Sequence, residues 1–355
     1  MADPKTTRKM HFVHPLFDYF LIGGGLSLVF LVLLFAVPGL KQMLSAEAFM
    51  ATTIPFFILL SNNTHFAAST VRLYTKPGSY KALPFLTFLF PLIMVLLLTA
   101  SISQADRIGP FIQAVYLSWS PFHYAAQAYG LGVLYCYRSG CPISSGHKRI
   151  LWWAALMPFL HNMLAGESGT GVSIFLPLGW LAEGTTLATV IGVLQSLAIG
   201  LSVGLLAWFI VAVRKDKQRF APWITPLAIA TNGIWWLVLP PLDAFIWATI
   251  FHGIQYLAIV VIFHVKDQVK LPGNRHSRAY HVVWFYAVSL AAAYGLFSCL
   301  PNFYMLVGFG EVESMLLVVA AINLHHFIVD AYIWRFGDKD RNRRIAQETS
   351  PAPTA

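Results

Sequence analysis

Apolar residues occur along the chain in ten long runs that are separated by short polar segments. Each run is close to the roughly 20 residues that a helix needs to cross a bilayer. The pattern therefore predicts an all-α protein, a polytopic membrane bundle of about ten transmembrane helices. The runs lie near 16–37, 48–70, 83–104, 111–135, 151–170, 187–213, 222–240, 243–264, 280–300 and 314–334.

Only one domain is predicted, the membrane bundle over residues 1–335. Residues 336–355 are first charged and then rich in Pro and Thr, which predicts a disordered tail. The first run is too long for the core of a signal peptide, so we expect it to remain as a span.

Composition supports a membrane location, because 57% of the residues are hydrophobic and only 11% are charged. A soluble domain carries roughly 25% charged residues. The formal net charge of +9 does not indicate a nucleic-acid partner, since the basic residues are scattered through short loops.

The loop charges predict an orientation. If the N-terminus lies inside, all of the 24 Lys and Arg except Lys41 and Arg107 fall in cytoplasmic segments. This asymmetry is typical of inner loops. We therefore expect a multi-pass protein of the cell membrane with both termini cytoplasmic.

Four even-numbered runs each carry a histidine inside the apolar stretch: His65, His123, His252 and His326. They lie 7 to 15 residues before the first basic residue of the inner end. At 1.5 Å per residue, this places them roughly 10 to 23 Å from the inner interface. A single membrane histidine is usually an interhelical hydrogen-bonding residue. Four at overlapping depths, together with the tandem partner His325, favour a metal-binding cluster.

Each histidine has a polar neighbour three or four residues away on its own helix face. We expect Asn62, Gln127, Gln255 and Asp330 to hydrogen-bond the ligands and orient them, because a metal-bound imidazole commonly donates its second N–H. Tyr256 and Asp330 are candidate catalytic residues, and His161 beside Asn162 is a possible additional ligand.

The donor set limits the metal. Neutral imidazoles with few carboxylates suit iron, copper or zinc rather than magnesium or calcium. The apolar surroundings suit O2 and a hydrophobic small-molecule or lipid substrate. Cys136 and Cys141 form a C-x4-C pair, but no second pair completes a site.

Two motifs resemble segments of the bacterial Brp/Blh type of carotenoid-cleaving dioxygenase. They are Phe251-His252-Gly253 and the pairing of His326 with Asp330. The resemblance implies one iron among His65, His123, His252 and either His325 or His326, with O2 attacking a lipid-like alkene. The family's His-Gly segment continues to an Asp, whereas this chain continues Ile254-Gln255-Tyr256.

Two other function classes stay open. His252-x3-Tyr256 and the tandem His325-His326 also resemble pieces of the copper site of haem-copper oxidases, which implies a haem- or copper-binding redox protein. The third class is a proton-coupled transporter in which histidines and Asp330 relay protons.

Overall fold

The computed structural model describes residues 10–164, 185–217 and 220–334, and these residues form helices but no strand. The all-α prediction is confirmed. The expected tail at 336–355 lies outside the described residues.

The first half of the chain contains short helices, π-helical segments labelled η, and one long helix. In order these are α1 (Pro15–Phe17), η1 (Asp18–Ile22), α2 (Gly25–Ala36), α3 (Leu40–Leu44), η2 (Phe49–Thr53), α4 (Ile54–Ile58), η3 (Leu59–Asn63), α5 (Thr64–Thr75), α6 (Ser79–Ala82), η4 (Phe85–Leu89), α7 (Phe90–Ser103) and α8 (Ala105–Arg138).

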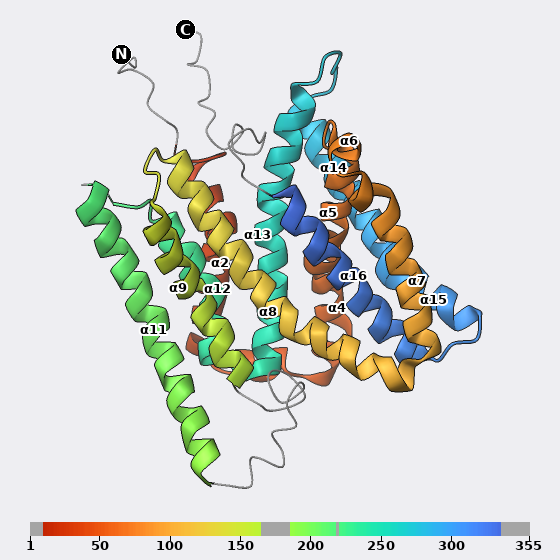
Figure 1. Cartoon of the computed structure of the whole chain (residues 1–355), viewed down its shortest axis with the longest axis horizontal. Helices are drawn as coiled ribbons and strands as arrows, with labels where there is room; N and C mark the ends of the chain where they lie inside the picture. Colours follow the sequence, from red (N-terminus) through yellow and green to blue (C-terminus); the bar gives the residue numbers. More distant parts are fainter. Residues whose placement is uncertain (1–9, 165–184, 218–219, 335–355) are drawn as a thin grey trace.

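The second half consists mostly of long helices. They are α9 (Ser145–Leu164), α11 (Thr185–Lys217), α12 (Ile224–Val238), α13 (Pro241–Val269), α14 (Arg278–Tyr294), η6 (Gly295–Cys299), α15 (Leu300–Leu306) and α16 (Glu311–Ile333). In Figure 1, α11 lies at one edge of the bundle and α7 and α15 lie at the other, with α13 and α16 between them.

Within the described residues, five helices are long and apolar enough to span a membrane, or six if one bent pair counts as a span. The remaining expected spans are also helical, but they are shorter or more polar. Two of these, α5 and α8, carry histidines on buried faces, where a helix surrounded by other helices does not need an apolar surface. The ten-span count stays a prediction.

The bent pair is the first expected span, which breaks by 60° between Ile22 and Gly25. Gly24 has a φ of +80°, and a Cβ there would collide with the Thr231 side chain. Two distant side chains bind the carbonyls that the break releases: Thr231 Oγ1 donates to Gly23 O at 3.0 Å, and Gln255 Nε2 donates to Ile22 O at 3.1 Å. The break is therefore fixed by tertiary hydrogen bonds.

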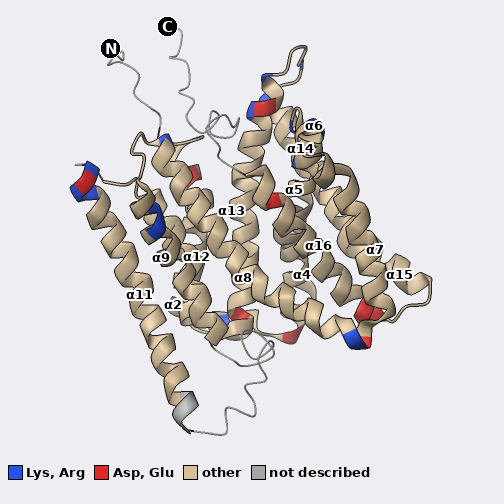
Figure 2. Cartoon of the chain, viewed as in Figure 1, with Lys and Arg blue, Asp and Glu red and all other residues tan. Residues whose placement is uncertain are grey.

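Charged residues lie mainly at the two ends of the bundle (Figure 2). Lys and Arg gather at the end where α13 finishes and α14 begins, while the opposite end carries most of the described Asp and Glu. The middle is almost free of charge. The distribution agrees with a bundle whose central section faces lipid.

Candidate metal centre

Four helices, α5, α8, α13 and α16, each place one histidine at a common point in the bundle. His65, His123, His252 and His326 are 0%, 7%, 2% and 1% exposed. The Nε2 atom of His326 lies 3.1 Å from the Nε2 of His65 and 3.1 Å from the Nε2 of His123. The His252 ring lies 4.9 Å from the His65 ring and 5.2 Å from the His123 ring, measured between centroids.

Hydrogen bonds at the far side of two rings determine which nitrogen carries the proton. His65 Nδ1 lies 2.8 Å from the backbone oxygen of Asn62, which can only accept, so Nδ1 must donate. Ser69 Oγ donates its one proton to Phe66 O at 2.8 Å. It therefore accepts from His326 Nδ1 at 2.9 Å. When both rings are neutral, the Nε2 atoms of His65 and His326 therefore carry lone pairs.

Two lone pairs that face each other at 3.1 Å repel unless a cation lies between them. Two nitrogens bound to one metal at about 2.1 Å are roughly 3.0 to 3.4 Å apart for angles between 90° and 109°. Both ring nitrogens of His252 are also buried without a hydrogen-bond partner. The donor set of this cluster can therefore hold a metal ion, with His65, His123 and His252 as one possible ligand group.

Gly253 brings α13 close enough for His252 to reach the cluster. A Cβ at this position would lie 2.8 Å from Ser61 C and 2.9 Å from Asn62 N, both backbone atoms of η3. The contact lies three residues before His65 along the neighbouring segment. The His-Gly pair thus combines a ligand with the small residue that close helix approach requires.

The π-helical segment η3 changes the register of the helix just before His65. Thr64 Oγ1 donates to Leu59 O at 2.6 Å, and the Tyr286 hydroxyl donates to Leu60 O at 3.0 Å. Such bulges frequently occur at functional sites, because they turn one face of a helix toward a new neighbour.

Aromatic rings surround the imidazoles and exclude water. The closest ring pairs, by centroid distance, are His252 with Tyr124 at 4.2 Å, His65 with Phe66 at 4.2 Å and His123 with Phe327 at 4.7 Å. All three aromatic side chains are buried. These rings could not be singled out from the sequence, because the chain contains 27 Phe and no pattern distinguishes them.

Asp330 and Tyr256 lie next to the histidines on α16 and α13. The Tyr256 hydroxyl donates to Asp330 Oδ1 at 2.7 Å, and Trp334 Nε1 donates to the hydroxyl at 3.3 Å. A carboxylate oxygen of Asp330 lies within 4.8 Å of ring nitrogens of both His123 and His326. Asp330 thus binds Tyr256 on the neighbouring helix, while Ser69 is the partner of His326 Nδ1.

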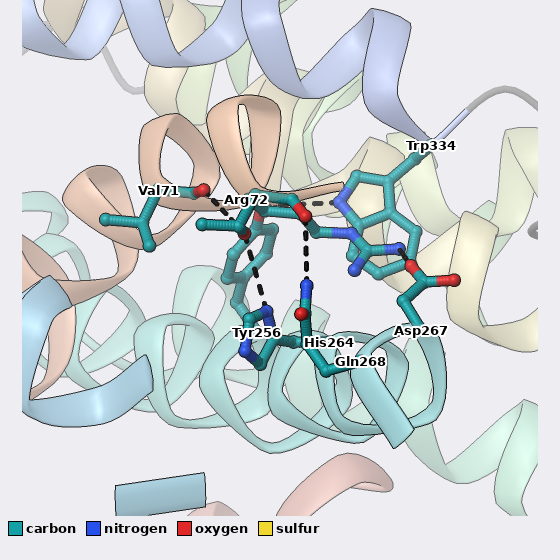
Figure 3. Close-up of polar contacts among 8 residues, drawn as sticks. Val71, Arg72, Tyr256, His264, Asp267, Gln268 and Trp334 are labelled. Atoms are coloured by element: carbon teal, nitrogen blue, oxygen red, sulfur yellow. Dashed lines mark hydrogen bonds and ion pairs between the residues drawn. The ribbon is translucent and has the colours of Figure 1, made fainter. Parts of the chain in front are cut away.

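Figure 3 shows a buried ion pair between Arg72 of α5 and Asp267 of α13. Arg72 Nη2 is 3.3 Å from Asp267 Oδ2, and both side chains are only 1% exposed. The guanidinium also lies 5.3 Å from the Trp334 ring and 5.6 Å from the Phe263 ring. Arg72 is expected among the cytoplasmic loop charges from the sequence, and no pattern along the chain predicts its pairing with Asp267.

Two expected ligands are not brought to the cluster. The His325 ring stacks on Phe90 of α7, with centroids 5.1 Å apart. Adjacent helical residues differ in direction by about 100°, so only one of the tandem histidines can face the cluster. His161 Nδ1 lies 3.3 Å from Gln195 O on α11, away from the other histidines.

Three expected orienting residues do not hydrogen-bond the imidazole rings through their side chains. Gln127 Nε2 donates to the carbonyl of His252 at 3.4 Å, and Gln255 binds the broken first helix. Asn62 contributes its main-chain oxygen, not its amide. For the two glutamines, a backbone carbonyl on another helical segment takes the place of an imidazole nitrogen.

Comparison of the chain with protein-family models, curated proteins and solved structures finds no match. The resemblance to the Brp/Blh dioxygenase type therefore remains an expectation that rests on the short histidine motifs.

Proposed function

We propose that this protein is a membrane-embedded metalloenzyme whose histidines hold one non-haem iron for the oxidation of a hydrophobic substrate. The observation that carries the proposal is the pair of Nε2 lone pairs that face each other between His65 and His326. With His123 and His252, they form a set of up to four imidazole donors, which suits iron, copper or zinc.

Bound iron would supply the chemistry with O2 that amino-acid side chains lack. The chain contributes the ligand positions, fixed by Asn62 O and Ser69 Oγ, and the aromatic walls that exclude water. The Tyr256 hydroxyl donates to Asp330 across a 2.7 Å hydrogen bond within reach of the ligands. We assign them the role of holding or moving a proton near the reacting atoms.

The substrate class follows from the surroundings of the site. The ligands lie in the interior of apolar helices, where O2 and lipids both partition. A hydrophobic substrate, such as an isoprenoid, a carotenoid or a lipid, can reach this depth laterally through the bilayer. We also propose ten spans in the cell membrane with both termini cytoplasmic, supported by the charge asymmetry in the sequence and in Figure 2.

The geometry gives less support to a haem- or copper-binding redox protein and to a proton-coupled transporter. Two imidazoles on opposite sides of a haem iron would have nitrogens about 4 Å apart, with an open plane between them. Here the nitrogens are 3.1 Å apart, and other histidines and aromatic rings fill the surroundings. The copper motif needs both tandem histidines, but His325 faces Phe90. A transporter would use Asp330 to relay protons, but Asp330 accepts a hydrogen bond from Tyr256.

Metal analysis of the detergent-purified chain tests the proposal. We expect about one iron per chain and no Soret band. His123→Ala and His252→Ala should lose the metal, whereas the matched control His276→Ala, in an exposed loop, should keep it. A Soret band would favour the haem class. Equal metal content in all three variants, or none in the native chain, would refute the assigned ligands.

A further inference from the structure

A long groove of about 1110 Å³ runs along the face of α13 that lies away from the metal centre. Its walls come from the N-terminal segment around Phe12 and Phe17, from α4 and η3, and from α14. Lining residues extend from Ile250 of α13 to Lys270 directly after it, a distance of about 30 Å at the helical rise.

The groove is separate from the histidine cluster. Ile254, Leu257 and Val261 line it, whereas His252 and Tyr256 project in other directions, about 100° to 180° away around the axis of α13. A molecule in the groove therefore does not reach the histidine cluster by this route. Binding in the groove is independent of the proposed enzyme activity.

The lining changes in character along its length. Near the middle of α13 it consists mostly of Leu, Ile, Val and Phe side chains, with Ser61 and Tyr286 as the polar exceptions. At the end where α13 meets α14 it contains four cationic residues, while no Asp or Glu occurs among its described lining residues. The four are Arg138, Lys266, Lys270 and Arg278.

We propose that this groove binds an anionic phospholipid of the bilayer, with its headgroup at the cationic end and its acyl chains along α13. Charge complementarity selects the occupant, since basic pockets between helices at the cytoplasmic side bind anionic headgroups. The length also fits, because half of a bilayer with its headgroup region is about 20 to 22 Å deep. A zwitterionic lipid fills the apolar part equally well but gains less at the cationic end.

Native mass spectrometry of the full chain, titrated separately with phosphatidylglycerol and phosphatidylcholine of the same acyl chains, measures this preference. The groove variant is Lys270→Glu with Arg278→Glu, both at exposed positions. The matched control is Lys81→Glu with Arg149→Glu, two exposed basic residues outside the groove. We expect the groove variant to bind phosphatidylglycerol about tenfold more weakly, and the control to bind it normally.

A second variant tests the shape of the groove while its charges stay in place. Ala258→Trp places a large ring in the apolar section and should reduce the binding of both lipids. An unchanged melting temperature of each variant in the same detergent shows that the bundle is folded. Equal binding of the two lipids by the native chain would overturn the proposal, as would full binding by both groove variants or a lipid-free dimer that uses this face.

Discussion

Gly253 allows α13 to pack against η3, and replacing it with alanine is the sharpest test of the way this bundle assembles its ligands. The new Cβ would lie 2.8 Å from Ser61 C, about 0.6 Å short of the 3.4 Å at which ordinary contact begins. The atoms that it meets belong to backbone, so they cannot rotate aside. The two segments must therefore separate by several tenths of an ångström at least.

That separation moves His252 away from His65, because each residue lies close to the contact on its own segment. Protein metal sites tolerate deviations of about 0.2 Å in ligand distance. We expect Gly253→Ala to weaken metal binding by about 10- to 100-fold, the range seen when the support of a ligand is lost. Overpacking should also destabilise the bundle by about 1–3 kcal/mol.

The assay is metal retention during titration with a chelator, alongside thermal unfolding in the same detergent. Gly130→Ala on α8 is the matched control, since a Cβ there meets nothing within 4 Å. The control should keep its metal and lose no stability, because alanine favours helix over glycine. Native metal affinity in Gly253→Ala would show that the close packing of α13 does not position the ligands.

Three further predictions follow from the contacts. His326→Ala should lose the metal, while His325→Ala should retain it in the same metal analysis; equal loss would place both imidazoles at the centre. Arg72→Met should destabilise the protein by about 3–5 kcal/mol in thermal unfolding, because the buried charge of Asp267 then lacks this ion-pair partner. Adding Asp267→Leu should restore most of the lost stability, because it removes that buried charge. Tyr256→Phe should cost about 1–3 kcal/mol by removing a donor from a buried carboxylate, with metal content unchanged; a native melting temperature would contradict this.

The helical class and the level of the histidines were predictable, because both follow from distances along single segments. Apolar run length identified the helices, and the spacing to the inner basic residues placed His65, His123, His252 and His326 at overlapping depths, where the structure brings them together. The depth of a residue along a helix does not say in which direction its side chain points around the helix axis. The choice between His325 and His326 therefore required knowing how the helices pack.

The partners of the side chains were harder to predict, because they come from other segments. Ser69 lies one turn from His65, yet it binds His326 on α16. The position of Arg72 after an apolar run predicts a cation in a loop. It becomes buried because Asp267, almost 200 residues later, supplies the opposite charge. Such pairings depend on which helices are neighbours, and no single segment contains that information.

The broken first helix constrains the order in which the protein assembles. The carbonyls of Ile22 and Gly23 obtain their donors from residues 233 and 208 positions further along the chain. An unpaired carbonyl costs several kcal/mol in hydrocarbon. The bend is therefore stable only after α12 and α13 have been inserted, so this segment takes its final shape late. Spin labels flanking Gly24 should accordingly lie further apart in a chain truncated before α12 than in the complete chain.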